Sequence, residues 1–140
     1  MSETAEQEWK TIESGVPDPM PLMHPVMRKN FGQWAWHDRL RPGVLHHTAK
    51  SGDEVWTVRA GTQRQLDVYT IRTLCDIADD FADGHVRFTA RSNIEYMVGD
   101  RAKVEPLIDR LEKKGFPVGG TGNSISMISH TQGWLHCDIP

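Results

Sequence analysis

The sequence predicts an α+β domain of the split βαβ type, preceded by an irregular and apolar N-terminal arm. Two regions alternate apolar and polar residues as strands do, and two others repeat apolar residues at helical spacing. From Glu54 onward the order is strand, helix, strand, strand, helix, strand, which is the ferredoxin-like order. The 140 residues, 38% of them hydrophobic, suit one domain of ordinary size with a real core.

The arm covers residues 1–43. Its five prolines, at positions 17, 19, 21, 25 and 42, fix φ and remove backbone donors, so we predict no regular helix or sheet there. Apolar residues are nonetheless frequent between Met20 and Trp36, whereas disordered tails are poor in them. We therefore expect the arm to lie across another surface, which is either its own domain or a partner subunit.

Regular structure is predicted from Val44. Residues 44–49 and 54–60 have the pattern of two strands, joined by a turn around the segment KSGD. A helix follows over 67–84, with Asp67 placed to cap its start and a glycine after its end. Its predicted apolar stripe comprises Val68, Ile71, Leu74, Cys75, Ala78 and Phe81.

The next strand is predicted over 86–91. Side chains in a strand change face at every residue, so Arg87, Thr89 and Arg91 would share one face. The apolar residues between them, Val86, Phe88 and Ala90, would share the other face. A turn near Ser92 and Asn93 then leads to a returning strand with the sequence IEYMV, which completes a second hairpin.

A second helix is predicted over 100–115, capped by Asp100. Pro106 lies in its early turns, so we expect the first turn to be distorted. Its apolar stripe comprises Val104, Leu107, Ile108 and Leu111. The segment FPV then suits a short last strand, which ends a domain over 44–118. Residues 119–140 are interpreted as the truncated start of a further domain.

Composition excludes several classes of protein. The formal net charge of −3 argues against the global positive field of proteins that bind nucleic acid non-specifically. Two cysteines without a C-x-x-C spacing indicate a reducing compartment. No apolar run approaches the length of a membrane span, and acidic residues stand where a signal peptide would be basic. We therefore expect a cytoplasmic protein.

Four arginines are the strongest candidates for a binding site. Arg59 and Arg64 flank the loop after the 54–60 strand, and Arg87 and Arg91 lie on a strand that we expect to be its neighbour in the sheet. Arginine is always charged and matches carboxylates and oxyanions with paired donors. The alternative is a row of solvated surface arginines, or arginines paired with nearby acids. As a group they indicate an anion site, because both helices should cover the opposite face.

Two C-terminal segments carry weaker signals. GGTGNS, residues 119–124, offers small residues that can turn backbone N–H groups toward an anion, but it lacks the spacing of a phosphate loop. ISHTQGWLHC places His130, His136 and Cys137 close together. A structural zinc site needs four such ligands, and Cys75 is expected on the apolar face of a helix, so we do not predict zinc.

The residues quoted above also resemble a known family. The stretches RPGVLHHTAKSGDEVWTVRAGTQRQLDVYTIRTLCDIADDFADGHVRFTARSNIEYMV and FPVGGTGNSISMISHTQGWLHCDIP are similar to the N-terminal part of the beta subunit of dissimilatory sulfite reductase. In the wider sulfite and nitrite reductase family, the R-x-T-x-R strand marks the half-domain that faces siroheme. Siroheme is a tetrapyrrole rimmed by carboxylates, which would explain a cationic sheet face.

The resemblance implies a set of site residues. Arg87, Thr89 and Arg91 match the R-x-T-x-R strand, and Arg59 matches the arginine that faces the macrocycle or its bound anion. Arg59 is thus the one candidate for a catalytic anion contact. Cys137 matches the first thiolate of a [4Fe-4S] cluster beside siroheme. Further cofactor contacts are expected at Arg64, Gly120, Thr121, Asn123, His130 and Gln132.

The resemblance also implies an assembly. A beta subunit of this family pairs with an alpha subunit in an alpha2-beta2 complex, interconverts sulfite and sulfide by six electrons, and meets a small sulfur-carrier protein. A [4Fe-4S] cluster needs four ligands and this chain offers one in the matching place, so we expect no complete catalysis from the 140 residues alone. The alternative interpretation is a non-catalytic ferredoxin-like module that binds a ligand or a partner subunit.

Overall fold

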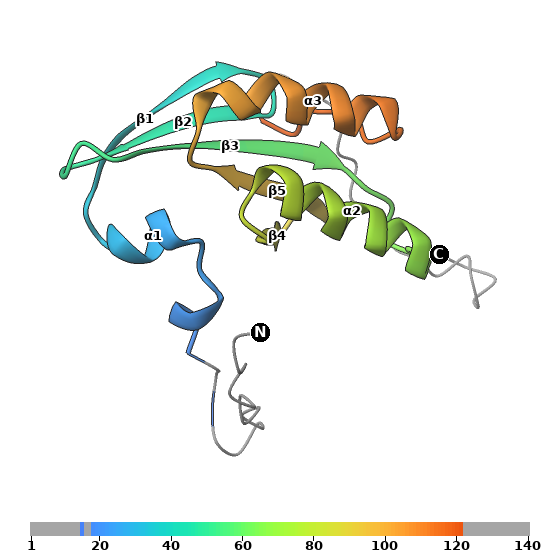
Figure 1. The fold of residues 1–140 in the computed structure, drawn as a ribbon, viewed down its shortest axis with the longest axis horizontal. Coiled ribbons are helices and arrows are strands. Elements are labelled where there is room, and N and C mark those ends of the chain that lie inside the picture. Colours follow the sequence, from blue (N-terminus) through green and yellow to red (C-terminus); the bar gives the residue numbers. More distant parts are fainter. Residues whose placement is uncertain (1–14, 16–17, 122–140) are drawn as a thin grey trace, which may run out of the picture.

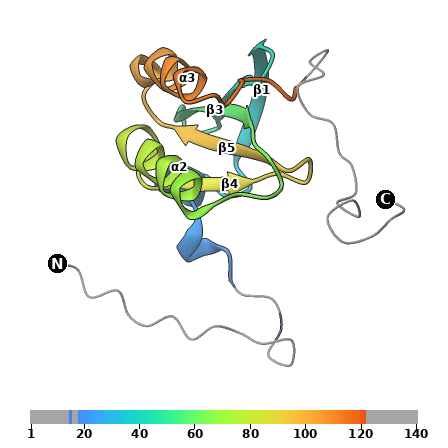
Figure 2. The same ribbon diagram turned by 90° about the vertical axis from the view of Figure 1, so that its right-hand side faces the viewer.

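The computed structural model describes residue 15 and residues 18–121. These residues form a five-stranded antiparallel sheet in the order β1-β2-β3-β5-β4, with helices α2 and α3 on one face (Figures 1 and 2). The other face of the sheet carries no helix in these views. The main elements are β1 (Trp34–Arg41), β2 (Val44–Ala49), β3 (Glu54–Gly61), α2 (Val68–Phe81), β4 (Val86–Phe88), β5 (Asn93–Val98) and α3 (Val104–Lys113).

The topology confirms the predicted ferredoxin-like arrangement. Strand β5 lies between β3 and β4 and is antiparallel to both, so β3 and β4 are parallel and α2 crosses between them. The expectation that the strands of Arg59 and Arg87 are direct neighbours is therefore wrong, because the returning strand of the second hairpin separates them. The last predicted strand, residues 116–118, is reduced to one antiparallel bridge between Ala60 and Val118. Its place beside β3 is the one that the fourth strand of a split βαβ unit takes, and β2 occupies the rest of that edge.

The helix caps follow the sequence closely. The backbone N–H of Thr70 donates to Asp67 Oδ1 over 2.7 Å, and that of Ala102 donates to Asp100 Oδ1 over 2.9 Å. The turn that we expected Pro106 to distort is a separate 3-10 turn, Arg101–Lys103, ahead of α3. The stripe of α3 is buried as predicted, at Val104, Leu107, Ile108 and Leu111.

Helix α2 has the predicted period, but only part of its predicted stripe meets the core. Leu74, Ala78 and Phe81 of the predicted stripe contact the core as expected, and Ile77, which was not predicted, joins them. Val68, Ile71 and Cys75 were also expected in the core but are exposed. These three recur at i, i+3 and i+7, so they share a second side of α2, which faces solvent.

The expectation that residues 1–43 lack regular structure is wrong for part of that range. Strand β1 pairs with β2 along the edge of the sheet, and a short helix, α1 (Pro25–Lys29), and a 3-10 turn, Met20–Leu22, precede it. None of the five prolines lies within β1, so the strand keeps its backbone donors. Strand β4 is also shorter than predicted, since the chain turns at Thr89–Ser92, where Ser92 has φ +62°.

The described part of the arm packs against its own domain. His24 is buried; its Nδ1 accepts from the N–H of Val26, so its Nε2 carries the proton and donates to Asp83 Oδ2 over 3.1 Å. Asn30 donates to Asp53 Oδ2 over 2.8 Å and accepts from Ser51 Oγ over 2.7 Å. Of the two surfaces considered for the arm, its own domain is therefore the one that it contacts here.

After α3 the chain returns to the sheet and passes close to a glycine in the β1–β2 turn. Gly43, in the β1–β2 turn, has φ +80°, and a Cβ there would lie within 2.9 Å of three backbone atoms of Gly119. The N–H of Gly43 donates to Thr121 Oγ1 over 2.6 Å, and the N–H of Gly119 donates to the carbonyl of Arg59 over 3.0 Å. Glycine at position 43 thus allows residues 119–121 to lie beside β3.

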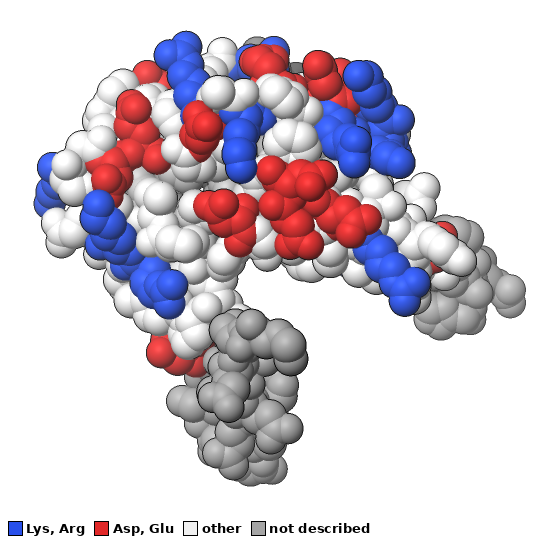
Figure 3. Space-filling model, viewed as in Figure 1, with Lys and Arg blue, Asp and Glu red and all other residues white. Residues whose placement is uncertain are grey.

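Figure 3 shows the face that carries the helices. Acidic side chains gather over α2, where Asp76, Asp79 and Asp80 are exposed, and basic side chains lie along α3. On this face, Arg110 Nη2 lies 3.8 Å from Asp80 Oδ2, and both side chains are about half exposed. The exposed basic residues of α3 are thus on the opposite side of the sheet from Arg59 and Arg87, and are partly offset by nearby acids. Of the described helices, none is long and apolar enough to cross a membrane.

We predict that Gly43→Ala destabilises the chain more than Gly52→Ala. Both glycines have positive φ, at +80° and +89°, so each alanine carries a left-handed backbone cost of about 1–2 kcal/mol. Only at position 43 does the added Cβ also meet backbone atoms, because nothing lies within 4 Å at position 52. In urea denaturation, Gly43→Ala should lower the free energy of unfolding by more than about 3 kcal/mol. Equal losses in the two variants would contradict the close contact.

We predict that His24 makes stability fall in mild acid. Burial lowers the pKa of His24 below its ordinary value of 6.5, although the Asp83 carboxylate acts in the opposite direction. The unfolded chain then binds a proton that the folded chain does not, so the free energy of unfolding drops as the pH falls from about 6.5. His24→Asn keeps a capping acceptor and should flatten the change in thermal midpoint between about pH 7.5 and 5.5. An equal fall of the thermal midpoint with pH in the natural chain and in His24→Asn would contradict this account.

Candidate functional site

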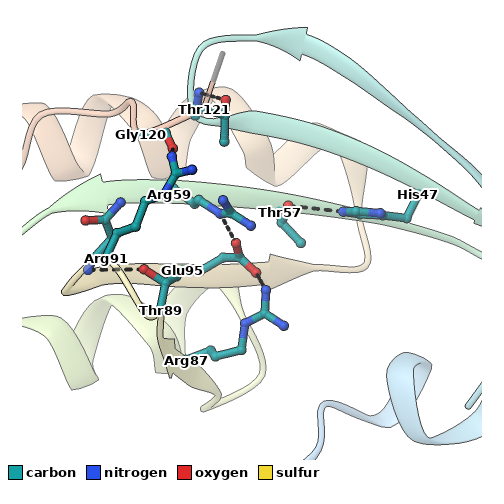
Figure 4. Close-up of polar contacts among 11 residues, drawn as sticks. His47, Thr57, Arg59, Arg87, Thr89, Arg91, Glu95, Gly120 and Thr121 are labelled. Carbon is teal, nitrogen blue, oxygen red and sulfur yellow. Dashed lines mark hydrogen bonds and ion pairs between the residues drawn. The ribbon is translucent and has the colours of Figure 1, made fainter. Parts of the chain in front are cut away.

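Three charged residues form one row across the helix-free face of the sheet. Arg59 on β3 and Arg87 on β4 each pair in register with Glu95 on β5, the strand between them (Figure 4). The apolar neighbours Val58, Ile94 and Tyr96 enter the core on the other face, because side chains alternate along each strand. Alternation and strand order together bring Arg59 and Arg87 to one place, as the sequence predicted.

Glu95 joins the two arginines. Its side chain is completely buried, and its two oxygens accept from different partners: Oε2 from Arg59 Nε and Oε1 from Arg87 Nη2. A buried carboxylate is costly unless it is paired and hydrogen-bonded, and here both conditions are met. The possibility that these arginines pair with a nearby acid is therefore correct for Arg59 and Arg87.

The pairing leaves donors for another group. A guanidinium has five N–H donors, and within residues 18–121 each arginine gives Glu95 one of its nitrogens. Arg59 is 24% exposed and Arg87 is 50% exposed, so both still reach the surface. The row can thus bind an anion without breaking its internal contacts.

A hollow of about 390 Å³ lies over these donors. Its lining residues are Arg59, Arg87, Phe88, Thr89, Ala90 and Arg91. Three arginines and one glutamate give this region a formal charge of +2 (+3 − 1) in a chain whose net charge is −3. The positive charge is local, as the composition required, and it is concentrated where the sheet is uncovered.

Arg91 and Thr89 come from the turn after β4. Arg91 Nη1 donates to the carbonyl of Gly120 over 3.2 Å, which links this turn to the segment after α3. Thr89 Oγ1 accepts from the N–H of Asn93 over 3.2 Å, so its hydroxyl proton remains able to donate. Arg91 was expected on a strand beside Thr89, and the turn brings it to the same hollow by another route.

Asn93 shows that this face has unmet hydrogen-bonding capacity. Its side chain is fully buried, and neither its oxygen nor its nitrogen has a partner among the described residues. It lies two residues before Glu95 and so shares the face of the arginine row. Buried amides are normally hydrogen-bonded. Asn93 does not line the hollow, so the three guanidinium groups are the donors that fit a ligand with several carboxylates or oxyanions.

The same face continues to a histidine at its far end. His47 Nε2 lies 3.2 Å from Thr57 Oγ1, two residues before Arg59 (Figure 4). Burial lowers the pKa of His47, and the neighbouring His37 lowers it further. His47 is therefore neutral at neutral pH and adds no positive charge to the row.

Other predicted residues have different positions. Arg64 lies in the loop after β3 and does not line the hollow. Thr121 accepts from Gly43, and Gly120 presents its carbonyl to Arg91, so the described start of GGTGNS is engaged in packing. Within residues 18–121, no cluster of three or more histidines, cysteines or carboxylates could hold a metal. Asn123, His130, Gln132 and Cys137 lie outside the described residues.

Comparison with known proteins gives a consistent family. Residues 47–114 match the nitrite/sulfite reductase ferredoxin-like half domain. A dissimilatory-type sulfite reductase beta subunit from Archaeoglobus fulgidus is 46% identical over 133 residues, which covers 90% of this chain and 36% of that protein. Those from Nitratidesulfovibrio vulgaris and Megalodesulfovibrio gigas are 50% and 47% identical, and cover 83% and 94% of this chain.

A solved structure supports the fold. The crystal structure of dissimilatory sulfite reductase I superimposes with a TM-score of 0.59 over 76% of this chain, at 13% sequence identity. The chain spans 32% to 55% of the length of the three curated relatives and 29% of the solved chain. The chain is therefore a homologue of dissimilatory-type sulfite reductase beta subunits, and its residues 47–114 form the ferredoxin-like half domain of the nitrite and sulfite reductases.

Proposed function

We propose that Arg59, Arg87, Thr89 and Arg91 bind the carboxylates of siroheme, as part of a dissimilatory sulfite reductase beta subunit. The observation that carries this proposal is the convergence of three guanidinium groups on one hollow beside a buried glutamate. The names of the relatives supply the class of enzyme, and the donor set supplies the reason that a polycarboxylate fits. The proposed reaction of the assembled enzyme is the six-electron interconversion of sulfite and sulfide.

Each residue has a distinct proposed role. Arg87 and Arg91 are exposed and hold carboxylates at the rim, while Thr89 donates its hydroxyl proton between them. Arg59 is more buried, so its charge is less screened, and it can stabilise the negative charge of a sulfur oxyanion. Siroheme, when bound, supplies the iron centre at which electrons reach sulfur. The residues of this chain bind siroheme and orient it.

Cys137 is proposed as one thiolate ligand of a [4Fe-4S] cluster next to siroheme. Such a cluster is held by four cysteines, and the only other cysteine, Cys75, lies on the exposed side of α2, away from the sheet face of the arginine row. The remaining ligands would have to come from residues beyond these 140. We therefore expect the chain alone to bind cofactor without completing turnover.

A second proposed function is subunit interaction, and strand β1 favours it. All of β1 except Trp34 is exposed, and Trp36 and Leu40 have exposed fractions of 49% and 53%. An exposed edge strand with large apolar side chains is a surface that a partner commonly covers. The proposed partner is the alpha subunit of an alpha2-beta2 complex, to which a small sulfur-carrier protein would also deliver substrate.

We predict that the double variant Arg87→Ala/Arg91→Ala binds siroheme at least about tenfold more weakly than the natural chain. A charge-assisted hydrogen bond contributes about 1.5–3 kcal/mol, and partial exposure reduces that value here. Absorption titration of siroheme into each purified chain gives the two Kd values. The matched control is Arg110→Ala/Lys113→Ala, which removes the same charge from the helix-covered face. Unchanged affinity in the first variant, or an equal loss in both, would refute the proposed site.

We predict that Trp36→Ser/Leu40→Ser lowers retention of a co-expressed alpha subunit several-fold, because it removes two apolar side chains from the proposed interface. Affinity co-purification measures the retained fraction. Tyr69→Ser/Ile71→Ser is the control, since it removes two exposed apolar side chains from α2, with exposed fractions of 80% and 45%. Full retention by the β1 variant would remove the support for docking at this edge.

A further inference from the structure

A buried glutamate is unexpected in a site that attracts anions. Glu95 lowers the formal charge of the arginine cluster from +3 to +2, and it would repel any bound carboxylate. An apolar or amide side chain at this position would leave the cluster more attractive to an anion. The position of Glu95 therefore calls for a reason other than attraction of the ligand.

The geometry around Glu95 supplies that reason. Its side chain is completely buried on β5, the strand between β3 and β4, so the backbone ladders on both sides hold it. Each carboxylate oxygen accepts from one arginine, which sets the two guanidinium groups at a fixed separation. Arg59 uses Nε, the nitrogen nearest its stem, so this hydrogen bond needs neither of its two terminal nitrogens.

We propose that Glu95 is a positioning residue that aims Arg59 and Arg87 at two separate carboxylates of one ligand. This inference rests on the proposed function of the site. Free arginine side chains lose rotamer entropy when a ligand orders them. Anchoring at Glu95 orders both before the ligand arrives, so less free energy is lost on binding. The arrangement selects a rigid polycarboxylate, for which two fixed guanidinium groups match two fixed acceptors.

Glutamine cannot replace glutamate in this role. Its side chain has one acceptor oxygen, and its NH2 group would face the N–H groups of the second arginine. One of the two arginines would therefore lose its hydrogen bond to residue 95, and with it its fixed position. Aspartate keeps the charge but is one methylene shorter, so its carboxylate cannot reach both arginines from the same backbone position. The two variants separate the effect of charge from the effect of position.

The test is siroheme titration of the full 140-residue chain with Glu95→Gln and with Glu95→Asp. Positioning predicts that both variants bind at least about fivefold more weakly, even though Glu95→Gln adds one positive charge. If charge alone mattered, Glu95→Gln would bind more tightly, most of all at low salt, and Glu95→Asp would bind as the natural chain does. Either of these two results overturns the proposal.

A double-mutant cycle distinguishes positioning from general damage to the fold. Because Glu95 acts through the arginines, Glu95→Gln should cause no further loss of siroheme affinity in the Arg59→Lys/Arg87→Lys background. A full additional loss there would show that the substitution harms binding by another route and would overturn the proposal. If Glu95→Gln does not fold, the same cycle is run with Glu95→Asp.

The proposed function can fail separately from this inference. If Arg87→Ala/Arg91→Ala leaves siroheme affinity unchanged, the site itself is wrong. If that variant loses affinity while the Glu95 variants keep it, the site stands and only the role of Glu95 is wrong.

Discussion

The buried carboxylate of Glu95 is the interaction on which the candidate site depends. It lies on β5, the strand between β3 and β4, and it holds arginines from the strands on either side. Arg59 is 36 residues from Glu95 in the sequence, and Arg87 is 8 residues from it. The fold brings them together, because strand order and register place all three in one row. The negative charge of the carboxylate in turn offsets the repulsion between the two arginines, which would otherwise make such a row costly to assemble.

Much of the fold was predictable from local signals. Alternation gave β2, β3 and β5, and the caps Asp67 and Asp100 gave the starts of both helical segments. The failures have physical causes. Strand β1 does alternate, with Trp34, Trp36 and Leu40 at even spacings in the sequence, but the prolines before and after it led us to expect irregular structure across the whole arm. The α2 stripe was correct at Leu74, Ala78 and Phe81 but also included the exposed residues Val68, Ile71 and Cys75, because periodicity alone cannot tell which of two apolar sides of a helix finds a partner.

The site was predictable in part. Arg59 and Arg87 were expected on one face because the strand order follows from the fold. Glu95 and Asn93 were missed, although Glu95 is the one charged residue among the apolar residues of β5, and that was the available signal. Residues 119–121 were interpreted as a source of backbone donors, whereas contacts with Gly43 and Arg91 make them a packed edge of the site. Tertiary contacts of this kind leave no periodic pattern in the sequence.

The central claim is that carboxylates of a tetrapyrrole bind to guanidinium groups on this face. The most direct measurement compares the affinity of the natural chain for siroheme with its affinity for siroheme whose carboxylates have been esterified. The account predicts that esterification removes most of the affinity, because neutral esters cannot form charge-assisted hydrogen bonds with Arg59, Arg87 and Arg91. Equal affinity for the two forms would show that binding depends on the macrocycle alone, and it would contradict the account.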